Sequence, residues 1–149
     1  MNRVLAIDPG RKGAIVVLDG DLGIVRALWQ VQTEALCPRG VYVPGAMASA
    51  IRDAVASYHV EWAVLETQGA RAREGRSACF TTGAGWGLWR GILACMLGVS
   101  VIEARPATWV PAILGDIPLL GKKRSIFRAR QIPGLVLVPE GRRVAQDGV

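Results

Sequence analysis

The chain has 149 residues, 51% of them hydrophobic, and carries a formal net charge of +6 at pH 7. This length suits one domain that buries roughly 70% of its unfolded surface, and the apolar content excludes bulk disorder. The longest apolar run, residues 88–97, is interrupted by an arginine and is too short to span a bilayer. The N-terminus lacks a signal-peptide pattern, so we expect a soluble cytoplasmic protein.

The first thirty residues predict a meander of three antiparallel strands. A continuously apolar strand over residues 3–8 ends at the Pro9-Gly10 turn, and a second strand follows over residues 13–18. Asp19-Gly20-Asp21 is typical of a hairpin turn and leads into a third strand, residues 22–29.

The remainder of the chain alternates helices with single strands. The spacing of apolar residues and the positions of Pro and Gly predict a loop over 30–44, a helix over 45–58, a strand over 61–67 and a polar loop over 68–82. A helix over 83–97 and a strand over 99–103 are predicted next. A helix from 106, which Pro111 bends or shortens, and a helix over 122–132 complete the chain order. The β-β-β-α-β-α-β-α order is a mixed α/β layout in one domain, residues 1–149.

Cysteine and histidine usage argues against two kinds of site. Cys37, Cys79 and Cys95 form no CxxC pair and are odd in number, so reduced thiols are the simplest interpretation and neither a disulfide framework nor a zinc site is expected. The single histidine, His59, lies in a polar connection and is expected at the surface.

Basic residues fall in two clusters, one over 71–76 and one over 122–130. With a pI near 9.9, the clusters favour a polyanionic partner, because Lys and Arg that neutralise phosphates release condensed counterions. Net charge by itself is equally compatible with a basic soluble protein that binds no nucleic acid.

Asp8 and Glu66 each follow a buried apolar strand and precede a polar segment. If the two strands are neighbours, the carboxylates lie side by side, and like charges so close either take up a proton or hold a cation. Oxygen ligands without His or Cys companions favour Mg²⁺, with Mn²⁺ as a substitute, over zinc. The spacing alone leaves open that Asp8 is an ordinary turn former.

Gly83, Gly87 and Gly91 recur every four residues and share one face of the predicted helix. Each glycine weakens a helix by about 1 kcal/mol relative to alanine, which indicates a face that needs close backbone approach. Packing on the sheet and contact with the same helix of a second copy are both open. Trp86 and Trp89 are expected in core or interface packing.

Several motifs resemble those of RuvC-type Holliday junction resolvases, a branch of the RNase H-like nucleases. In chain order they are VLAIDPG at 4–10 with Gly-Ala-Ile at 13–15, AVLE at 63–66, Trp-Arg-Gly at 89–91, VIEARPATW at 101–109, the basic helix over 122–131 and the terminal Asp147-Gly148. The later motifs are similar to phage-type members in particular. The resemblance spans nearly the whole chain and implies an RNase H-like mixed five-stranded sheet, three antiparallel strands and then parallel ones, flanked by helices.

The resemblance implies a metal-dependent, structure-selective DNA endonuclease that resolves four-way junctions by phosphodiester hydrolysis during recombination and repair. Asp8, Glu66 and Asp147 match the family's first three acids and would hold two Mg²⁺ ions roughly 3.5–4 Å apart. The family's fourth acid and closing helix have no counterpart before Val149. We therefore expect the final helix to be missing and an exposed apolar strip where it would lie.

Basic and aromatic side chains are expected to serve the DNA substrate. Lys122 or Lys123, at the start of the basic helix, would stabilise charge on the scissile phosphate, unless both belong to a solvated helix face. The residues expected to contact DNA are Arg71, Arg73, Arg76, Phe80, Arg124 and Arg128. Phe80 would stack on an unpaired base at the junction centre, with a core position as the alternative. Because two symmetric cuts need two sites, a homodimer is expected.

Other functions remain open. A YqgF-like or RNase H-like nuclease acting on RNA or hybrids shares the Asp-Pro-Gly turn. A catalytically inactive relative that binds branched DNA fits the lack of a fourth acid. An actin-like nucleotide-binding fold also begins with an acid after a strand, but it needs a second lobe for which the chain is too short.

Overall fold

Five strands form one mixed sheet in the order β3-β2-β1-β4-β5. The computed structural model describes residues 2–69 and 75–133. The antiparallel part contains β1 (Arg3–Ile7), β2 (Ala14–Asp19) and β3 (Ile24–Gln30), and the parallel part adds β4 (Trp62–Glu66) beside β1, then β5 (Ser100–Ala104). The predicted mixed sheet of an RNase H-like fold is confirmed.

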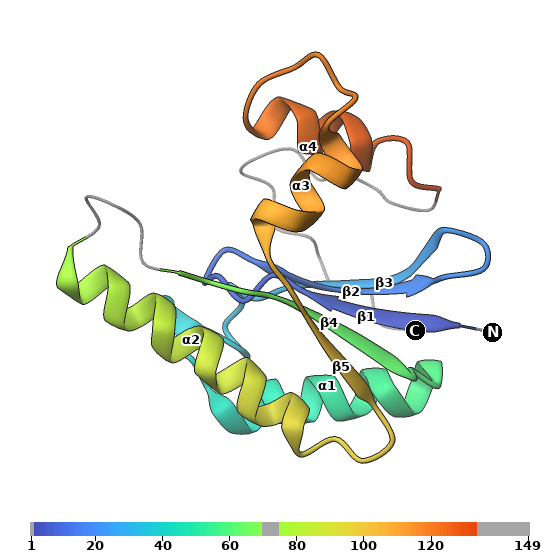
Figure 1. The fold of residues 1–149 in the computed structure, drawn as a ribbon. Helices are drawn as coiled ribbons and strands as arrows, with labels where there is room; N and C mark the ends of the chain where they lie inside the picture. The colour runs from blue at the N-terminus through green and yellow to red at the C-terminus, as the bar shows by residue number, and fades with distance from the viewer. Residues whose placement is uncertain (1, 70–74, 134–149) are drawn as a thin grey trace.

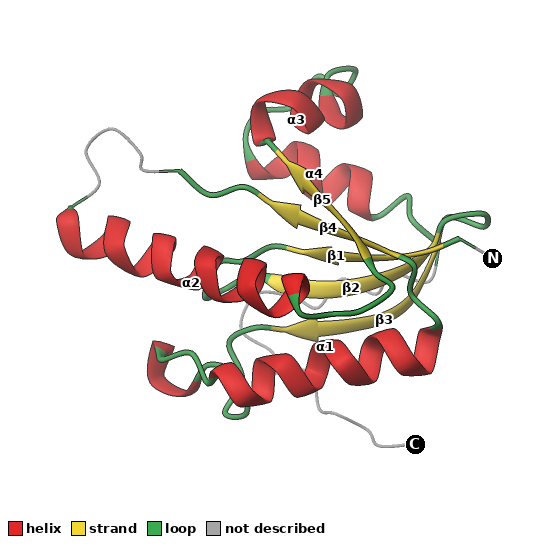
Figure 2. Ribbon diagram, turned by 60° about the horizontal axis from the view of Figure 1, so that its bottom comes forward, coloured by secondary structure: helices red, strands yellow, loops and turns green. Residues whose placement is uncertain are grey.

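Helices lie on both faces of this sheet (Figures 1 and 2). One face is covered by α1 (Pro44–Tyr58) and α2 (Arg76–Ala94), and the other carries α3 (Pro106–Leu114) and α4 (Lys122–Ala129). A short 3-10 helix, η1 (Pro38–Gly40), lies in the segment that leads from β3 to α1. Crossovers through α1 and α2 make β4 and β5 parallel to β1, as the chain order predicts.

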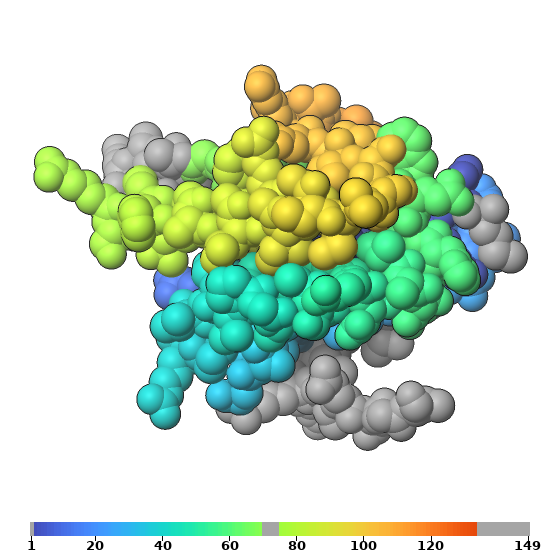
Figure 3. Space-filling view, turned by 90° about the horizontal axis from the view of Figure 1, so that it is seen from below, coloured from blue at the N-terminus to red at the C-terminus, as the bar shows by residue number. Residues whose placement is uncertain are grey.

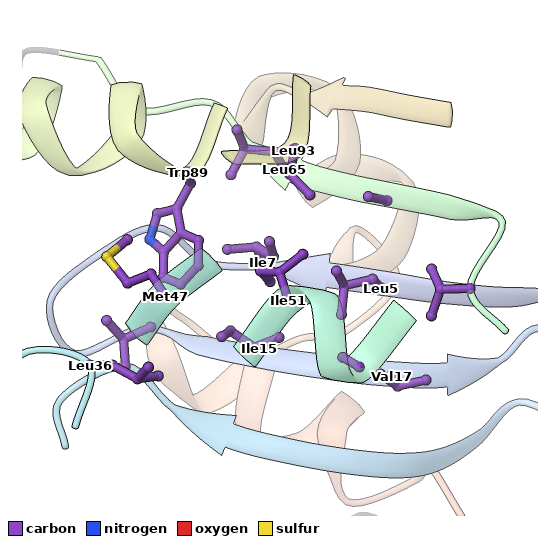
Figure 4. Close-up of a cluster of buried hydrophobic side chains, with 14 of the residues drawn as sticks. Leu5, Ile7, Ile15, Val17, Leu36, Met47, Ile51, Leu65, Trp89 and Leu93 are labelled. Carbon is purple, nitrogen blue, oxygen red and sulfur yellow. The ribbon is translucent and has the colours of Figure 1, made fainter. Parts of the chain in front are cut away.

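The hydrophobic core lies between the sheet and the α1–α2 face. Alternate strand residues point into it, so that Leu5 and Ile7 of β1 and Leu65 of β4 are buried. Figure 4 shows Trp89 of α2 and Met47 of α1 pointing toward these strand residues. Trp89 is completely buried, which confirms the predicted core role.

The opposite face of the sheet is apolar but less covered. One row of register partners crosses all five strands and consists of Leu28, Val16, Ala6, Val64 and Ile102. Both ends of the row are exposed, Leu28 to 37% and Ile102 to 48%. The row gives this face of the sheet an apolar surface, and the expectation of a missing final helix stays a prediction because residues 134–149 lie outside the described residues.

The main error of the sequence analysis concerns the start of α2. Residues 76–82 were expected in a polar loop, but α2 begins at Arg76. Its first turns extend past the end of the sheet (Figure 1), so their side chains have no apolar surface to cover and their sequence carries no amphipathic pattern.

Smaller expectations are met. His59 is exposed and ends α1 in a left-handed conformation, with φ of 50°. Cys37, Cys79 and Cys95 are all free thiols. Among the described residues, no helix is long and apolar enough to cross a membrane.

Candidate metal and nucleic-acid site

Asp8 lies in a tight turn directly after β1. Its amide donates to the Ala14 carbonyl at 3.0 Å, and its carboxylate Oδ1 accepts from the Gly10 amide at 3.0 Å. Gly13 closes the turn at a point where a Cβ would lie 2.1 Å from the Asp8 carbonyl oxygen, so only glycine fits there. The turn therefore holds Asp8 in one orientation while its side chain stays exposed to solvent.

Glu66 is the last residue of β4 and is half-buried. It lies in register with Ala104 of β5, and the next amide, that of Thr67, donates to the Ala104 carbonyl at 2.9 Å. The strand end that carries Glu66 is thus held by β5 on one side and by β1 on the other.

The two acids lie at the same edge of the sheet, at the ends of neighbouring strands. Ile7 and Leu65 are register partners in the parallel β1–β4 pair, and Asp8 and Glu66 are the residues that follow them. Neighbouring strands are about 4.8 Å apart, and successive side chains alternate between faces. Because Leu65 points into the core, Glu66 at the end of β4 projects to the opposite face, which carries α3 and α4. Asp8 lies in the turn after β1, where its carboxylate is among the charges that act on Tyr42.

Two carboxylates are the candidate metal ligands that the structure describes. Within residues 2–69 and 75–133, no three His, Cys, Asp or Glu side chains form a group that could hold an ion. Asp147, the third expected ligand, lies outside the described residues. The donor set that is present, two carboxylates and nearby backbone carbonyls, suits Mg²⁺ or Mn²⁺.

The DNA-contact residues predicted near α2 fall at its exposed N-terminal end. Arg76 opens the helix in an exposed position, and the Phe80 side chain is 79% exposed. The alternative that Phe80 belongs to the core is therefore wrong, whereas stacking on a base stays a prediction. Arg71 and Arg73 lie outside the described residues.

The basic helix α4 lies on the face of the sheet toward which Glu66 projects (Figure 1). Lys122 and Lys123 occupy its first turn and are exposed, and Arg124 is half-buried. Arg128 is tied to the preceding helix: it donates to both carboxylate oxygens of Asp116, at 2.7 and 2.9 Å, and to the Ile113 carbonyl at 3.0 Å. The structure thus gives Arg128 a role in holding α3 and α4 together, and its contact with DNA stays a prediction.

A cavity of about 130 Å³ adjoins the acids and was not foreseen from the sequence. Tyr42 forms one wall and donates a hydrogen bond of 3.1 Å to the Pro9 carbonyl. Burial is the main cause that raises the pKa of Tyr42, with Asp8 among the nearby groups that raise it further, so the phenol stays a neutral donor. Gly85 of α2 makes room for the Tyr42 ring, because a Cβ there would lie 2.5 Å from the phenol oxygen.

Two solved structures share this arrangement of strands and helices. Thermus thermophilus RuvC in complex with a Holliday junction substrate matches with a TM-score of 0.69 and 22% identity, over 93% of this chain and 84% of that one. A second Thermus thermophilus RuvC structure matches with a TM-score of 0.58 and 20% identity, over 92% of this chain and 83% of that one. The chain has the RuvC-type fold. No protein-family profile and no curated protein sequence matches it.

Within this RuvC-type fold, the glycine face of α2 is open. A Cβ added at Gly83, Gly87 or Gly91 would meet nothing within 4 Å, so the expectation that these glycines pack on the sheet is wrong. Gly87 and Gly91 instead line an apolar groove of about 800 Å³ between α1 and α2. Figure 3 shows these two helices side by side on one surface of the molecule.

Proposed function

We propose that this chain is a metal-dependent, structure-selective DNA endonuclease of the RuvC type that resolves four-way junctions by phosphodiester hydrolysis. The observation that carries the proposal is the pair Asp8 and Glu66, which directly follow the register partners Ile7 and Leu65 of neighbouring parallel strands and so lie at one edge of a RuvC-type sheet. Such a pair of adjacent carboxylates is costly unless protons or cations neutralise it.

Asp8, Glu66 and Asp147 are the proposed ligands of two Mg²⁺ ions, for which Mn²⁺ would substitute. When bound, the ions would supply an activated water and a stabilised 3′ leaving oxygen. The tight turn at Gly10 and Gly13 fixes the Asp8 carboxylate, so the ligand needs little reorganisation before substrate arrives.

Lys122 or Lys123 is the proposed electrostatic partner of the reacting phosphate. Both are exposed in the first turn of α4, on the side of the sheet toward which Glu66 projects. A positive charge near the phosphate stabilises the negative charge that develops as the bond breaks.

The exposed N-terminal end of α2 is the proposed contact with the junction. Arg76 adds positive charge there, and the largely exposed Phe80 offers a flat apolar surface on which an unpaired base would stack. The flanking Arg71 and Arg73, and Arg124 and Arg128 of the basic helix, are proposed to bind phosphates.

The active unit is proposed to be a homodimer. A four-way junction needs two cuts related by symmetry, and a twofold dimer presents two sites in that relation. The open glycine face of α2 and the apolar groove beside it form a surface that a second copy would cover, with backbones close together at Gly87 and Gly91.

Two other functions compete with junction cleavage. A nuclease that acts on RNA or RNA–DNA hybrids would use the same two acids, and a catalytically inactive relative would bind branched DNA without cutting it. All three functions share one fold and differ in whether a nucleic acid is cleaved and in which nucleic acid that is.

The proposal is tested with four substrates: a synthetic four-way junction, a linear duplex, an RNA–DNA hybrid and single-stranded RNA, each with and without Mg²⁺. We expect cleavage of the junction alone, only with Mg²⁺, and its loss in Asp8→Asn with junction binding retained. Preferred cleavage of RNA or hybrid would favour the second function. Tight junction binding without cleavage in Mg²⁺ or Mn²⁺ would favour the third.

A further inference from the structure

The cavity beside the acids is lined by three separate parts of the chain. Gly10 lies two residues after Asp8, Gln68 lies two residues after Glu66, and Thr82 comes from the exposed end of α2. Its volume of about 130 Å³ is below the roughly 300–1,000 Å³ of pockets that hold free small molecules. A group that belongs to a larger ligand is therefore the better fit.

The lining of this cavity is rich in hydrogen-bond donors, and none of the described residues that line it carries a carboxylate. Arg11 contributes a guanidinium, Gln68 an amide and Thr82 a hydroxyl, and none of the three has a hydrogen-bond or ion-pair partner among residues 2–69 and 75–133. The Tyr42 phenol donates to Pro9, and the Thr81 hydroxyl donates to the Ser77 carbonyl at 2.9 Å, so neither of these two hydroxyl protons is available.

Arg11 is an exposed residue whose guanidinium lies against a neighbouring glycine. At Gly40, which has φ of 79°, a Cβ would lie 2.9 Å from a terminal guanidinium nitrogen of Arg11. The missing side chain at Gly40 thus makes room for the guanidinium between the 37–41 segment and the turn after β1. A positioned cation with unused donors is the side chain that binds phosphate most effectively in proteins.

We propose that this cavity binds one phosphate of the DNA backbone through Arg11, Gln68 and Thr82. This phosphate is the neighbour of the one at which the strand is cut. The inference rests on the proposed function. The cavity-lining residues Gly10 and Gln68 each lie two residues after an acid, so only a DNA strand that reaches Asp8 and Glu66 would place its neighbouring phosphate at the cavity. The nearby Asp8 carboxylate opposes an anion here, and cations bound by the acids would remove that opposition.

The test uses the Asp8→Asn chain, which is expected to bind junctions without cutting them. A series of four-way junctions carries one uncharged methylphosphonate each, at successive positions around the cleavage site, and binding is measured by fluorescence titration. At one position next to the cut we expect affinity to fall roughly tenfold, as for loss of a charged hydrogen bond. Adding Arg11→Gln should weaken binding to the unmodified junction by a similar factor. In this double variant, a methylphosphonate at that one position should no longer lower the affinity, whereas the effects of the other positions should persist.

Lys12→Gln is the matched control. Lys12 is adjacent, exposed and equally charged, but it does not line the cavity. Its loss should leave the position-specific sensitivity unchanged, and Thr82→Val should reduce that sensitivity without abolishing it. If Arg11→Gln keeps the same pattern of sensitivity as the parent chain, the phosphate site is refuted although junction binding stands. If the parent chain does not prefer a junction to a linear duplex, both the proposed function and this inference fail.

Discussion

Tyr42 donates a hydrogen bond of 3.1 Å to the carbonyl of Pro9, the residue after the candidate ligand Asp8. The two partners are 33 positions apart in the sequence, and the bond fastens the turn after β1 to the segment that leads into α1. The Tyr42 ring in turn occupies the space that Gly85 leaves open on α2. One phenol thus links the candidate metal ligand's turn to both helices of the core face.

Replacing Tyr42 with Phe should lower the free energy of unfolding by about 0.5–1.5 kcal/mol, because the Pro9 carbonyl loses its donor while the ring is kept. Urea denaturation followed by circular dichroism measures the change. Tyr58→Phe is the control: that ring is also half-buried, and its hydroxyl has no hydrogen-bond partner among the described residues. Equal losses in the two variants would contradict a special role for the Tyr42 hydroxyl.

The Asp8 turn should not tolerate a side chain at Gly13. A Cβ there would overlap the Asp8 carbonyl oxygen at 2.1 Å and the Gly10 carbonyl oxygen at 2.8 Å, and backbone atoms cannot move aside as a flexible side chain can. Gly13→Ala should therefore cost about 3 kcal/mol, at the upper end of ordinary overpacking. Gly83→Ala, where a Cβ meets nothing within 4 Å and which does not line the α1–α2 groove, should instead stabilise the helix by up to about 1 kcal/mol. Thermal unfolding of both variants, compared at one concentration, tests the contrast.

The sequence was sufficient for the strands and for the position of Asp8 and Glu66 at strand ends, because these signals are local. An apolar run that ends at Asp8 or Glu66 predicts a buried strand with a carboxylate at its end whatever the rest of the chain does. That the two strands are neighbours is a property of the topology, and the order of elements made it a reasonable expectation.

Long-range contacts account for most of what the sequence did not reveal. No local pattern marks Tyr42, whose partners are Pro9 and Gly85, or Arg11, whose guanidinium lies against Gly40. The glycine periodicity at 83, 87 and 91 is real, but the glycine that permits a close contact is Gly85, outside that series. Periodicity identifies a face of a helix and does not identify what covers it.

The hairpin between β2 and β3 should make the protein sensitive to acid. Asp19 is buried, and it accepts hydrogen bonds from the Leu22 amide at 3.1 Å and from Arg26 at 3.0 Å. The hydrogen bond from Arg26 is the main cause that lowers the pKa of Asp19 below its ordinary value of 3.8, against the opposing effect of burial. Since the folded state prefers the ionised form, this contribution to stability is present above about pH 3.8 and is lost as pH falls through the lowered pKa.

Asp19→Asn should accordingly be less stable at neutral pH and should lose less further stability between about pH 4 and pH 2 than the parent chain. Urea midpoints measured across this range give the comparison. Asp116→Asn serves as the control: its pKa is lowered in the same direction by Arg128, but its side chain is 71% exposed and solvent screens the pair. A pH profile unchanged by Asp19→Asn would mean that other carboxylates dominate acid unfolding.

A charge in the α1–α2 groove should prevent dimer formation without unfolding the chain. Gly91 is exposed and lines the apolar groove, and a side chain there meets no atom of its own subunit, so Gly91→Glu should fold at least as well as the parent. In a dimer that covers this face, the new carboxylate would lose its hydration, and we expect the dimer dissociation constant to rise by about 100-fold or more. Sedimentation equilibrium over a range of protein concentrations measures the change. Ser49→Glu adds the same charge to an exposed position of α1 outside the groove and should leave the dimer intact. If Gly91→Glu still forms the dimer and Ser49→Glu does not, the glycine face of α2 is not the interface. The outer surface of α1 would then be the interface instead.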